Sequence, residues 1–221
     1  MKRRPDLSLA GFLELAEERL ILEPIAETTL PHISPLKGDH DLNEALIARL
    51  DEPPPPLKAA AVLVPVIERG TELFVILTQR PEHMTSHAGQ VAFPGGKVDQ
   101  SDPSVLAAAL REAHEEIGLE PSLVRPLGCL DIYQTGSGYR ILPVVALVEP
   151  HFEAKPNPHE VAVVFEVPLA FLVDRANHIV EESEWRGNMW RYYSIPYGER
   201  YIWGATAGMI RNLSERLDPP C

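Results

Sequence analysis

The stretch FPGGKVDQSDPSVLAAALREAHEEIGL, from Phe93 to Leu119, decides the fold because it predicts a glycine turn that leads into a helix. Asp102 is a candidate N-cap whose carboxylate would accept backbone N–H bonds. Pro103 suits the first helical position, where no amide proton is needed, and Gly118 would close the other end in a left-handed conformation. We therefore expect a helix that begins just after Asp102 and ends just before Gly118.

This helix has two predicted faces. Successive residues turn by about 100°, so apolar side chains at helical spacing form one stripe that packs on the core. The stripe consists of Leu106, Leu110, Ala113 and Ile117. Glu112, Glu115 and Glu116 fall together on another face, roughly 120° away. We expect one face to pack and the other to face a site.

The three glutamates favour a bound cation. A bare group of glutamates on a helix is more often a solvated face, but like charges three and four residues apart destabilise a helix by about 0.2–0.5 kcal/mol per pair. Carboxylate oxygens suit Mg²⁺ or Mn²⁺, which share their coordination with substrate phosphates. The pattern therefore indicates phosphate chemistry with a Mg²⁺ or Mn²⁺ cofactor.

The segment REAHEEIGL, from Arg111 to Leu119, resembles the second half of the Nudix hydrolase signature at every specified position. That half reads Arg-Glu-hydrophobic-X-Glu-Glu-X-Gly-hydrophobic. The first half differs from the general pattern, because Asp102 stands where the family has glutamate and one extra residue precedes Arg111. Upstream, ILTQR (76–80) and HAGQVAFPGG (87–96) resemble an additional motif of the coenzyme A pyrophosphatase branch.

The resemblance implies an α/β fold, a Nudix-type α/β/α sandwich with a mixed sheet. It implies metal-dependent hydrolysis of a phosphoanhydride, with coenzyme A cleaved to 4′-phosphopantetheine and adenosine 3′,5′-bisphosphate. Glu112, Glu115 and Glu116 would hold the metal together with the carbonyl of Gly96. Arg111 would orient these glutamates through an ion pair rather than touch the substrate.

Further site residues follow from the same resemblance. We expect Arg80, at the end of a strand, to contact the substrate phosphate or base, and Gly95 to allow close backbone approach. Glu160, just before a later strand, is a candidate metal ligand or general base.

The coenzyme A branch has serine or alanine after the strand-end arginine and a second arginine four residues beyond that, whereas this chain has Pro81 and Thr85. Recognition of the 3′-phosphate is then expected to be weaker by about 1–3 kcal/mol, unless another cation serves it. The candidates are Lys97 and Arg140.

Composition limits the class of protein. The chain has 221 residues, a formal net charge of −12 and 45% hydrophobic residues, which is typical of a soluble globular protein and disfavours a nucleic-acid partner. Glutamates interrupt the apolar residues near the N-terminus, so we expect neither a signal peptide nor a membrane span. The two cysteines, Cys129 and Cys221, lack metal-type spacing and favour a reducing, cytoplasmic setting. The partner is a small nucleotide substrate, and a homodimer is left open.

The chain divides at four consecutive prolines, Pro53 to Pro56. Residues 1–56 are predicted to be a helical extension with a proline-rich linker, with helices at 7–20 and 42–50. Residues 57–221 form the main domain. Its predicted strands are 59–68, 72–80, 124–132, 139–148, 161–167, 190–194 and 199–203, followed by a terminal helix whose apolar face contains Met209, Ile210, Leu213 and Leu217.

Two other functions remain open. A Nudix enzyme for ADP-ribose, a dinucleotide or a nucleoside triphosphate would use the same helix with a different pocket. A catalytically silent domain that binds a nucleotide as a sensor would be expected to have lost some of the glutamates.

Overall fold

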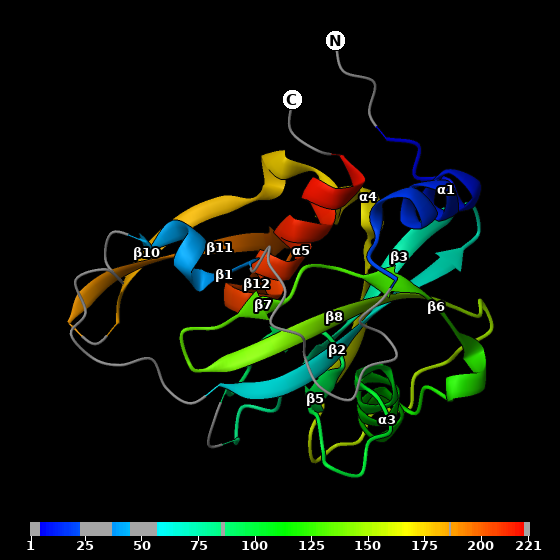
Figure 1. Cartoon of the computed structure of the whole chain (residues 1–221), viewed down its shortest axis with the longest axis horizontal. Coiled ribbons are helices and arrows are strands. Elements are labelled where there is room, and N and C mark those ends of the chain that lie inside the picture. Colours follow the sequence, from blue (N-terminus) through cyan, green and yellow to red (C-terminus); the bar gives the residue numbers. More distant parts are fainter. Residues whose placement is uncertain (1–4, 23–36, 45–56, 85–86, 186, 219–221) are drawn as a thin grey trace.

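The centre of the molecule is a mixed β-sheet. The computed structural model describes residues 5–22, 37–44, 57–84, 87–185 and 187–218. The strands of the sheet are β1 (Lys37–Gly38), β2 (Lys58–Arg69), β3 (Glu72–Gln79), β4 (Val91–Ala92), β5 (Gly95–Lys97), β6 (Val124–Cys129), β7 (Tyr133–Gln134), β8 (Tyr139–Val148) and β9 (Val163–Pro168). Within these residues the strand order is β1-β7-β8-β2-β3-β4, and β5, β6 and β9 pair with β2, β8 and β3 (Figure 1).

The long strands β2 and β8 form the middle of the sheet. They pair in parallel from Lys58 opposite Tyr139 to Ile67 opposite Val148. β2 and β3 form the predicted hairpin, and Gly70 in its turn has a φ of 68°, which glycine adopts at no steric cost. Because β2 is buried on both faces, its sequence reads as a continuous apolar run rather than an alternation.

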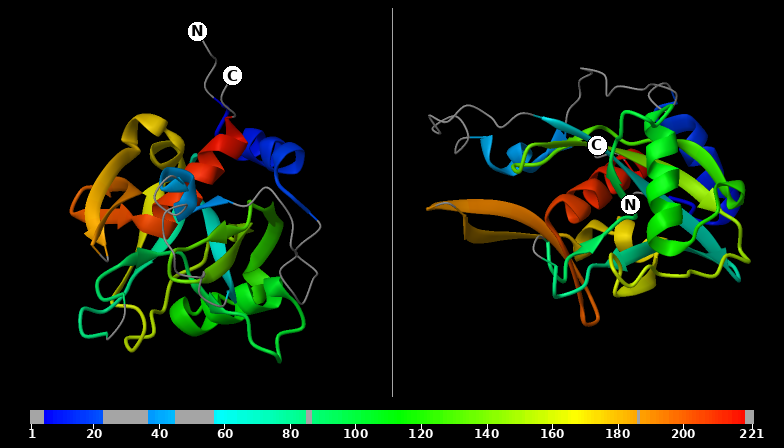
Figure 2. Two further views of the ribbon diagram at one scale, coloured as in Figure 1. Left: turned by 60° about the vertical axis from the view of Figure 1, so that its left-hand side comes forward. Right: turned by 90° about the horizontal axis from the view of Figure 1, so that it is seen from below.

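Helices cover both faces of this sheet. Helix α3 (Val105–Ile117) packs on one face, where β2 contributes Ala61 and Leu63. The opposite face of β2, with Val62 and Val64, packs under α1 (Leu9–Arg19), α4 (Leu169–Val173) and α5 (Gly204–Leu217). Figures 1 and 2 show α3 on one side of the sheet and α5 on the other. The expected α/β fold with a mixed sheet between helical layers is confirmed.

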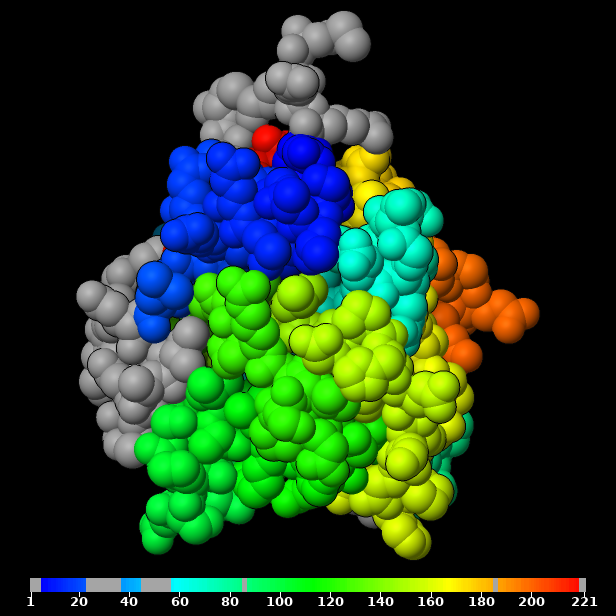
Figure 3. Space-filling model, turned by 90° about the vertical axis from the view of Figure 1, so that its right-hand side faces the viewer, coloured from blue at the N-terminus to red at the C-terminus, as the bar shows by residue number. Residues whose placement is uncertain are grey.

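The N-terminal helix is part of the same core. Ser8 caps α1 by accepting a hydrogen bond from the Gly11 amide, and Phe12 is fully buried in the layer that contains α5. A β-bridge joins Ile21 to Cys129, and Figure 3 shows the N-terminal segment against the body of the molecule. The predicted helix at 7–20 is confirmed with slightly shorter ends.

Most of the second predicted helix, 42–50, and the prolines at 53–56 lie outside the described residues. A 3₁₀ turn, η2 (Asp39–Leu42), precedes them.

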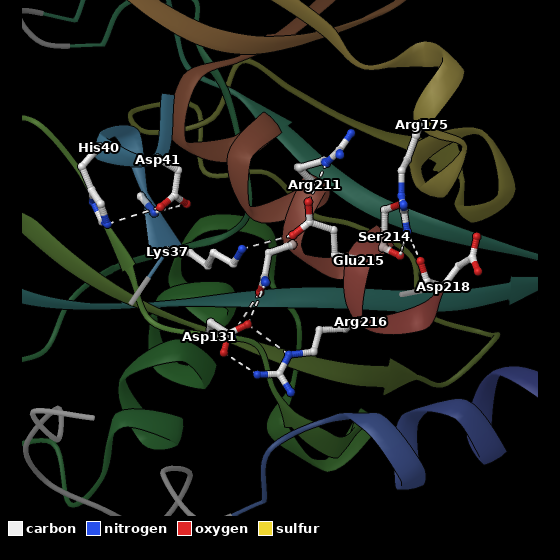
Figure 4. Close-up of polar contacts among 12 residues, drawn as sticks. Lys37, His40, Asp41, Asp131, Arg175, Arg211, Ser214, Glu215, Arg216 and Asp218 are labelled. Atoms are coloured by element: carbon white, nitrogen blue, oxygen red, sulfur yellow. Dashed lines mark hydrogen bonds and ion pairs between the residues drawn. The ribbon is translucent and has the colours of Figure 1, made fainter. Parts of the chain in front are cut away.

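A buried ion pair ties α5 to the end of β6. Asp131 is 4% exposed and accepts hydrogen bonds from Asn212 (Nδ2, 2.7 Å) and Arg216 (Nε, 3.0 Å; also Nη2) (Figure 4). Arg216 also donates to the carbonyl of Arg19 in α1 (3.2 Å). The predicted strand 124–132 therefore stops at Cys129, because Asp131 turns towards α5.

A second, three-stranded sheet precedes α5. Its strands are β10 (Ile179–Trp185), β11 (Asn188–Tyr197) and β12 (Arg200–Trp203), paired in that order. One face packs on α5 through Ile195 and Ile202. The strands expected at 190–194 and 199–203 are present, but β10 was not predicted because its three glutamates are unfavourable in strands.

The other predicted elements are present with shifted ends. β8 has the predicted bounds, whereas β9 begins at Val163 rather than at Val161. The apolar face of α5 is buried as expected. Within the described ranges, no helix combines the length and the apolar character needed to span a bilayer.

Candidate active site

The ends of α3 are set by two different caps. Gly118 ends the helix with a φ of 68°, as predicted, and its amide donates to the carbonyl of His114 (2.9 Å). The start differs from the prediction. Ser104 is the N-cap, and its Oγ accepts a hydrogen bond from the Ala107 amide (3.1 Å). The predicted cap at Asp102 is therefore wrong, because the serine hydroxyl lies closer to the first turn.

Asp102 instead receives Arg111. Its two oxygens accept bonds from Nε and Nη2 of Arg111, both at 2.9 Å, and the Asp99 amide also donates to it (2.8 Å). The guanidinium of Arg111 lowers the pKa of Asp102, and burial opposes this effect. Asp102, which stands where the Nudix signature has glutamate, therefore anchors the turn between β5 and α3.

Arg111 links this turn to the glutamates. Its Nη1 donates to Glu112 at 2.9 Å and to Glu115 at 3.4 Å, and its Nη2 donates to the carbonyl of Lys97 at 3.2 Å. One guanidinium thus holds the end of β5 and two carboxylates of α3 in a fixed relation.

The three glutamates differ sharply in burial. The side chain of Glu115 is 51% exposed and that of Glu112 is 18% exposed, whereas Glu116 as a residue is 5% exposed. Of the predicted apolar stripe, Ala113 and Ile117 are fully buried, whereas Leu106 and Leu110 are only partly buried and pack at the edge of the same core. Small residues form the packed face together with Glu116; they are Val105, Ala108, Ala109 and Ala113.

Glu116 lies on the core-facing side of α3. Its Oε2 accepts a hydrogen bond from the Gly95 amide at 3.2 Å. Burial raises the pKa of Glu116 to about 8; Glu112 and Glu160 act in the same direction, while the Gly95 bond and Arg80 oppose them. Burial likewise raises the pKa of Glu112, and Arg111 opposes the rise. The site therefore concentrates acidic groups where water is scarce.

The two glycines of β5 are needed for this approach. A Cβ on Gly96 would lie 2.5 Å from Cδ of Glu112, so the backbone of Gly96 lies directly against that carboxylate. Gly95 has a φ of 155°, and a Cβ there would collide with the carbonyl oxygen of Ala61 on β2. No other residue type fits either position without displacement.

Glu160 reaches the site on a loop that is bound to the end of α3. The amides of Lys155 and Asn157 donate to the carbonyls of Ile117 and Glu116, both at 2.9 Å, and satisfy acceptors that a helix end leaves open. The Glu160 amide donates to the Asn157 carbonyl at 3.0 Å. The Glu160 carboxylate is near enough to raise the pKa values of both Glu112 and Glu116.

Arg80 approaches from the end of β3. Its backbone amide donates to the Gln90 carbonyl at 3.0 Å, and its charge lowers the pKa of Glu116. Its Nε is buried and has no hydrogen-bond partner in the described part of the chain. A buried donor without an acceptor is costly, so Arg80 fits a site that receives an anionic group.

The other two candidate cations lie differently. Arg140 is 8% exposed on β8, and the strand alternation places it on the α3 side, with Leu142. Lys97 is exposed, and its pairing with Ala60 places its side chain on the face of β5 opposite Gly96. The structure therefore does not bring Lys97 together with the glutamates. Thr85 lies outside the described residues.

The glutamates offer the donors that a hard divalent ion requires. As they stand, no three Asp, Glu, His or Cys side chains of the described residues form a group that could hold a metal. Arg111 donates to the carboxylates of Glu112 and Glu115, whereas among the described residues the Gly95 amide is the one hydrogen-bond donor to Glu116. A buried carboxylate with a raised pKa and no bonded cation in the described part of the chain fits a place for a divalent cation.

A pocket of about 440 Å³ opens on the other side of the end of β3. The motifs at 76–80 and 87–96 contribute Gln79 and residues 87–91 to its lining, but the wall formed by β12 was not predicted from the sequence. His87 has a φ of 56°, and its Nδ1 lies 2.7 Å from Oε1 of Gln90. The lining residues are Gln79, Glu82, His87, Ala88, Gly89, Gln90, Val91, Glu199, Tyr201 and Trp203.

Comparison with known proteins identifies relatives of this arrangement. The NUDIX domain family model matches residues 57–192. The chain is 42% identical over 160 residues to the uncharacterized Nudix hydrolase NudL of Escherichia coli O1:K1, which covers 72% of this chain and 83% of that protein. Among solved structures, it is similar to an Ap4A hydrolase of C. elegans in a binary complex (20% identity, TM-score 0.44, covering 50% of this chain and 80% of that one). It is also similar to a MutT protein of Methanosarcina mazei Go1 (21% identity, TM-score 0.43, covering 55% and 84%).

Proposed function

The chain belongs to the NUDIX domain family, and we propose that it is a divalent-metal-dependent pyrophosphohydrolase whose preferred substrate is coenzyme A. The observation that carries the reaction class is the buried carboxylate of Glu116 beside Glu112, both held against the glycines of β5. The assignment of coenzyme A as the substrate rests on the resemblance of residues 76–80 and 87–96 to the coenzyme A branch. Coenzyme A contains the phosphoanhydride that such a site hydrolyses.

The residues of α3 would hold the cofactor. Glu112 and Glu116, with Glu115 at the exposed edge and the carbonyl of Gly96, would bind Mg²⁺ or Mn²⁺. When bound, such an ion supplies positive charge that offsets the charge on the phosphates and lowers the pKa of water. Arg111 positions Glu112 and Glu115 and does not touch the substrate.

Two residues outside the helix complete the proposed site. Arg80 would donate its Nε–H to a substrate phosphate, which supplies the acceptor that this buried nitrogen lacks among the described residues. Glu160 would accept the proton of the attacking water, because its carboxylate lies near Glu112 and Glu116 on a loop fixed to α3. The oxygen of water bonds to one phosphorus of the anhydride and the bridging oxygen leaves with the other, so each product carries one of the two anhydride phosphates, and the adenosine product keeps its 3′-phosphate as well.

A substrate panel with Mg²⁺ or Mn²⁺ tests this function. The panel contains coenzyme A, dephospho-coenzyme A, ADP-ribose, NADH and ATP, and the products are identified by chromatography. We expect the highest kcat/KM with coenzyme A and no turnover without a divalent ion. Rapid hydrolysis of ADP-ribose or NADH without turnover of coenzyme A would contradict the assignment of coenzyme A as the substrate. It would leave the assigned reaction class intact.

The glutamate variants test the reaction class itself. Glu112→Gln and Glu116→Gln should each lower kcat by about 100-fold or more, whereas Glu115→Gln should lower it less, since Glu115 is half exposed. Wild-type turnover in Glu116→Gln with an unchanged metal requirement would contradict the assignment.

A further inference from the structure

We propose that the pocket between β4 and β12 binds the base of the nucleotide substrate and selects a base with an exocyclic amino group, as adenine has. This inference rests on the proposed function. The glutamates and Arg80 contact groups that all nucleotides share, whereas this pocket offers a surface that can distinguish one base from another. Its volume of about 440 Å³ is of the size that small-molecule sites have.

Two aromatic side chains form one wall of this pocket. Tyr201 and Trp203 point to the same face of β12, because they are two residues apart, and they are 41% and 37% exposed. Two tyrosines hold Trp203 in place. The Tyr192 ring meets the Trp203 ring edge-on, with centroids 5.5 Å apart, and the centroid of the tilted Tyr201 ring lies 6.4 Å from that of Trp203. The Tyr201 hydroxyl donates to Glu181 (2.8 Å). A fixed, exposed indole is a stacking surface for a flat ring.

The charges of the lining specify the kind of ring. Glu82 and Glu199 line the pocket and are exposed, and none of its described lining residues is a lysine or arginine; Arg200, outside the lining, donates to the side-chain oxygen of Gln79. Ionised carboxylates only accept hydrogen bonds, so they favour a ring that donates and repel a phosphate. A 3′-phosphate would therefore point away from this pocket, while an amino group on the ring would face a carboxylate.

The pocket and the phosphate site share the end of β3. Gln79 lines the pocket, and its Nε2 donates to the Gly89 carbonyl at 3.2 Å. The next residue is Arg80, whose side chain leaves the opposite face of the strand, towards Glu116. The backbone of Gln90, another lining residue, accepts from the Arg80 amide. A nucleotide lying across the end of β3 would place its base in the pocket and its phosphates beside Arg80, on the opposite face of the strand.

Binding of AMP and IMP to the full chain tests this assignment. The two nucleotides differ at one edge of the purine: AMP has an amino group at position 6 and an acceptor at N1, whereas IMP has an oxygen at position 6 and an N–H at N1. Neither contains an anhydride that could be hydrolysed. Calorimetric titration with Mg²⁺ present should show AMP binding about tenfold more tightly than IMP, the effect of one good hydrogen bond to a charged group. The double variant Glu82→Gln, Glu199→Gln should reduce this preference severalfold.

Aromatic variants test the stacking surface. Trp203→Ala should weaken AMP binding about tenfold, and Trp203→Phe should restore most of the loss, while Mg²⁺ binding measured alone stays unchanged. Trp190→Ala is the matched control, because Trp190 lies on the same face of the second sheet but does not line the pocket. Equal affinity for AMP and IMP, or equal effects of Trp203→Ala and Trp190→Ala, would overturn the proposal.

The two proposals fail in different ways. If the substrate panel shows no hydrolysis but AMP binds as described, the pocket stands and the pyrophosphatase assignment falls. If coenzyme A is hydrolysed and Trp203→Ala leaves its KM unchanged, the pyrophosphatase assignment stands and the pocket assignment falls.

Discussion

At the scale of single residues, Glu116 combines a buried position in the core with a carboxyl group whose charged form burial disfavours. It occupies a core-facing position on α3 at 5% exposure, and burial raises its pKa from 4.5 to about 8. A carboxylate in such a place stabilises the folded chain only when a proton or a cation neutralises it.

The metal-free protein should therefore lose stability as the pH rises. Between pH 4.5 and about pH 8 the folded state keeps a proton on Glu116 that the unfolded state has released, so the free energy of unfolding falls across this window. Glu116→Gln should show a smaller fall. Urea unfolding in EDTA across the window measures both proteins, and parallel curves for the two would contradict the raised pKa.

At the scale of elements, the turn between β5 and α3 depends on the Asp102–Arg111 pair. Asp102→Asn should lower the free energy of unfolding by about 2 kcal/mol, because a side chain that is 5% exposed would lose a two-fold charge-assisted contact. Urea denaturation measures the change. Asp99→Asn is the control, since Asp99 is 64% exposed and lies 3.8 Å from Arg111, and it should change stability little. Similar losses in both variants would argue against a special role for Asp102.

The loop that follows β8 gives a second test at this scale. Glu160→Gln should lower kcat, because the amide cannot accept the proton of water. Glu153→Gln, an exposed change in the same loop, should keep the wild-type kcat. The role assigned to Glu160 would be lost if its pH–rate profile and metal affinity matched those of the wild type.

The ends and faces of α3 show how far sequence can predict such an element. Gly118 is a strong signal because few other residues adopt its left-handed backbone. The start is ambiguous, since Asp102 and Ser104 are both good N-caps and only the fold shows that Asp102 is engaged by Arg111. The packed face was predicted in part: Ala113 and Ile117 are buried as expected, but Ala108 and Ala109 were missed because alanines are weaker signals than Leu106 and Leu110, which are only partly buried.

At the scale of the whole molecule, the Asp131–Arg216 pair joins α1, α5 and the central sheet. Arg216→Ala should lower the free energy of unfolding by about 3 kcal/mol or more, because it leaves the buried carboxylate of Asp131 without its cation. Arg191→Ala, which breaks an exposed pair with Glu182, should cost less than about 1 kcal/mol. Urea denaturation of the two variants compares them, and equal losses would show that Asp131 needs no counter-charge.

Strand pairing marks the limit of prediction at this scale. Apolar runs located β2, β3 and β8 closely, because each is long and bounded by turn residues. Periodicity says nothing about which strands are neighbours, so the β2–β8 pairing and the approach of β12 to β4 came only from the structure. The glutamates of α3 were therefore predictable from one continuous segment, whereas the pocket at Trp203 was not.

The parallel pairing of β2 with β8 also bears on how the chain reaches its native state. The hairpin of β2 and β3 closes a short loop, whereas β8 can join β2 only after the whole of α3 and β6 has been bridged, and such long closures are slow. The loop that bonds to the end of α3 follows β8 in the chain. During synthesis, the glutamates of α3 emerge before the loop that carries Glu160, so we expect catalytic competence to be acquired late in folding.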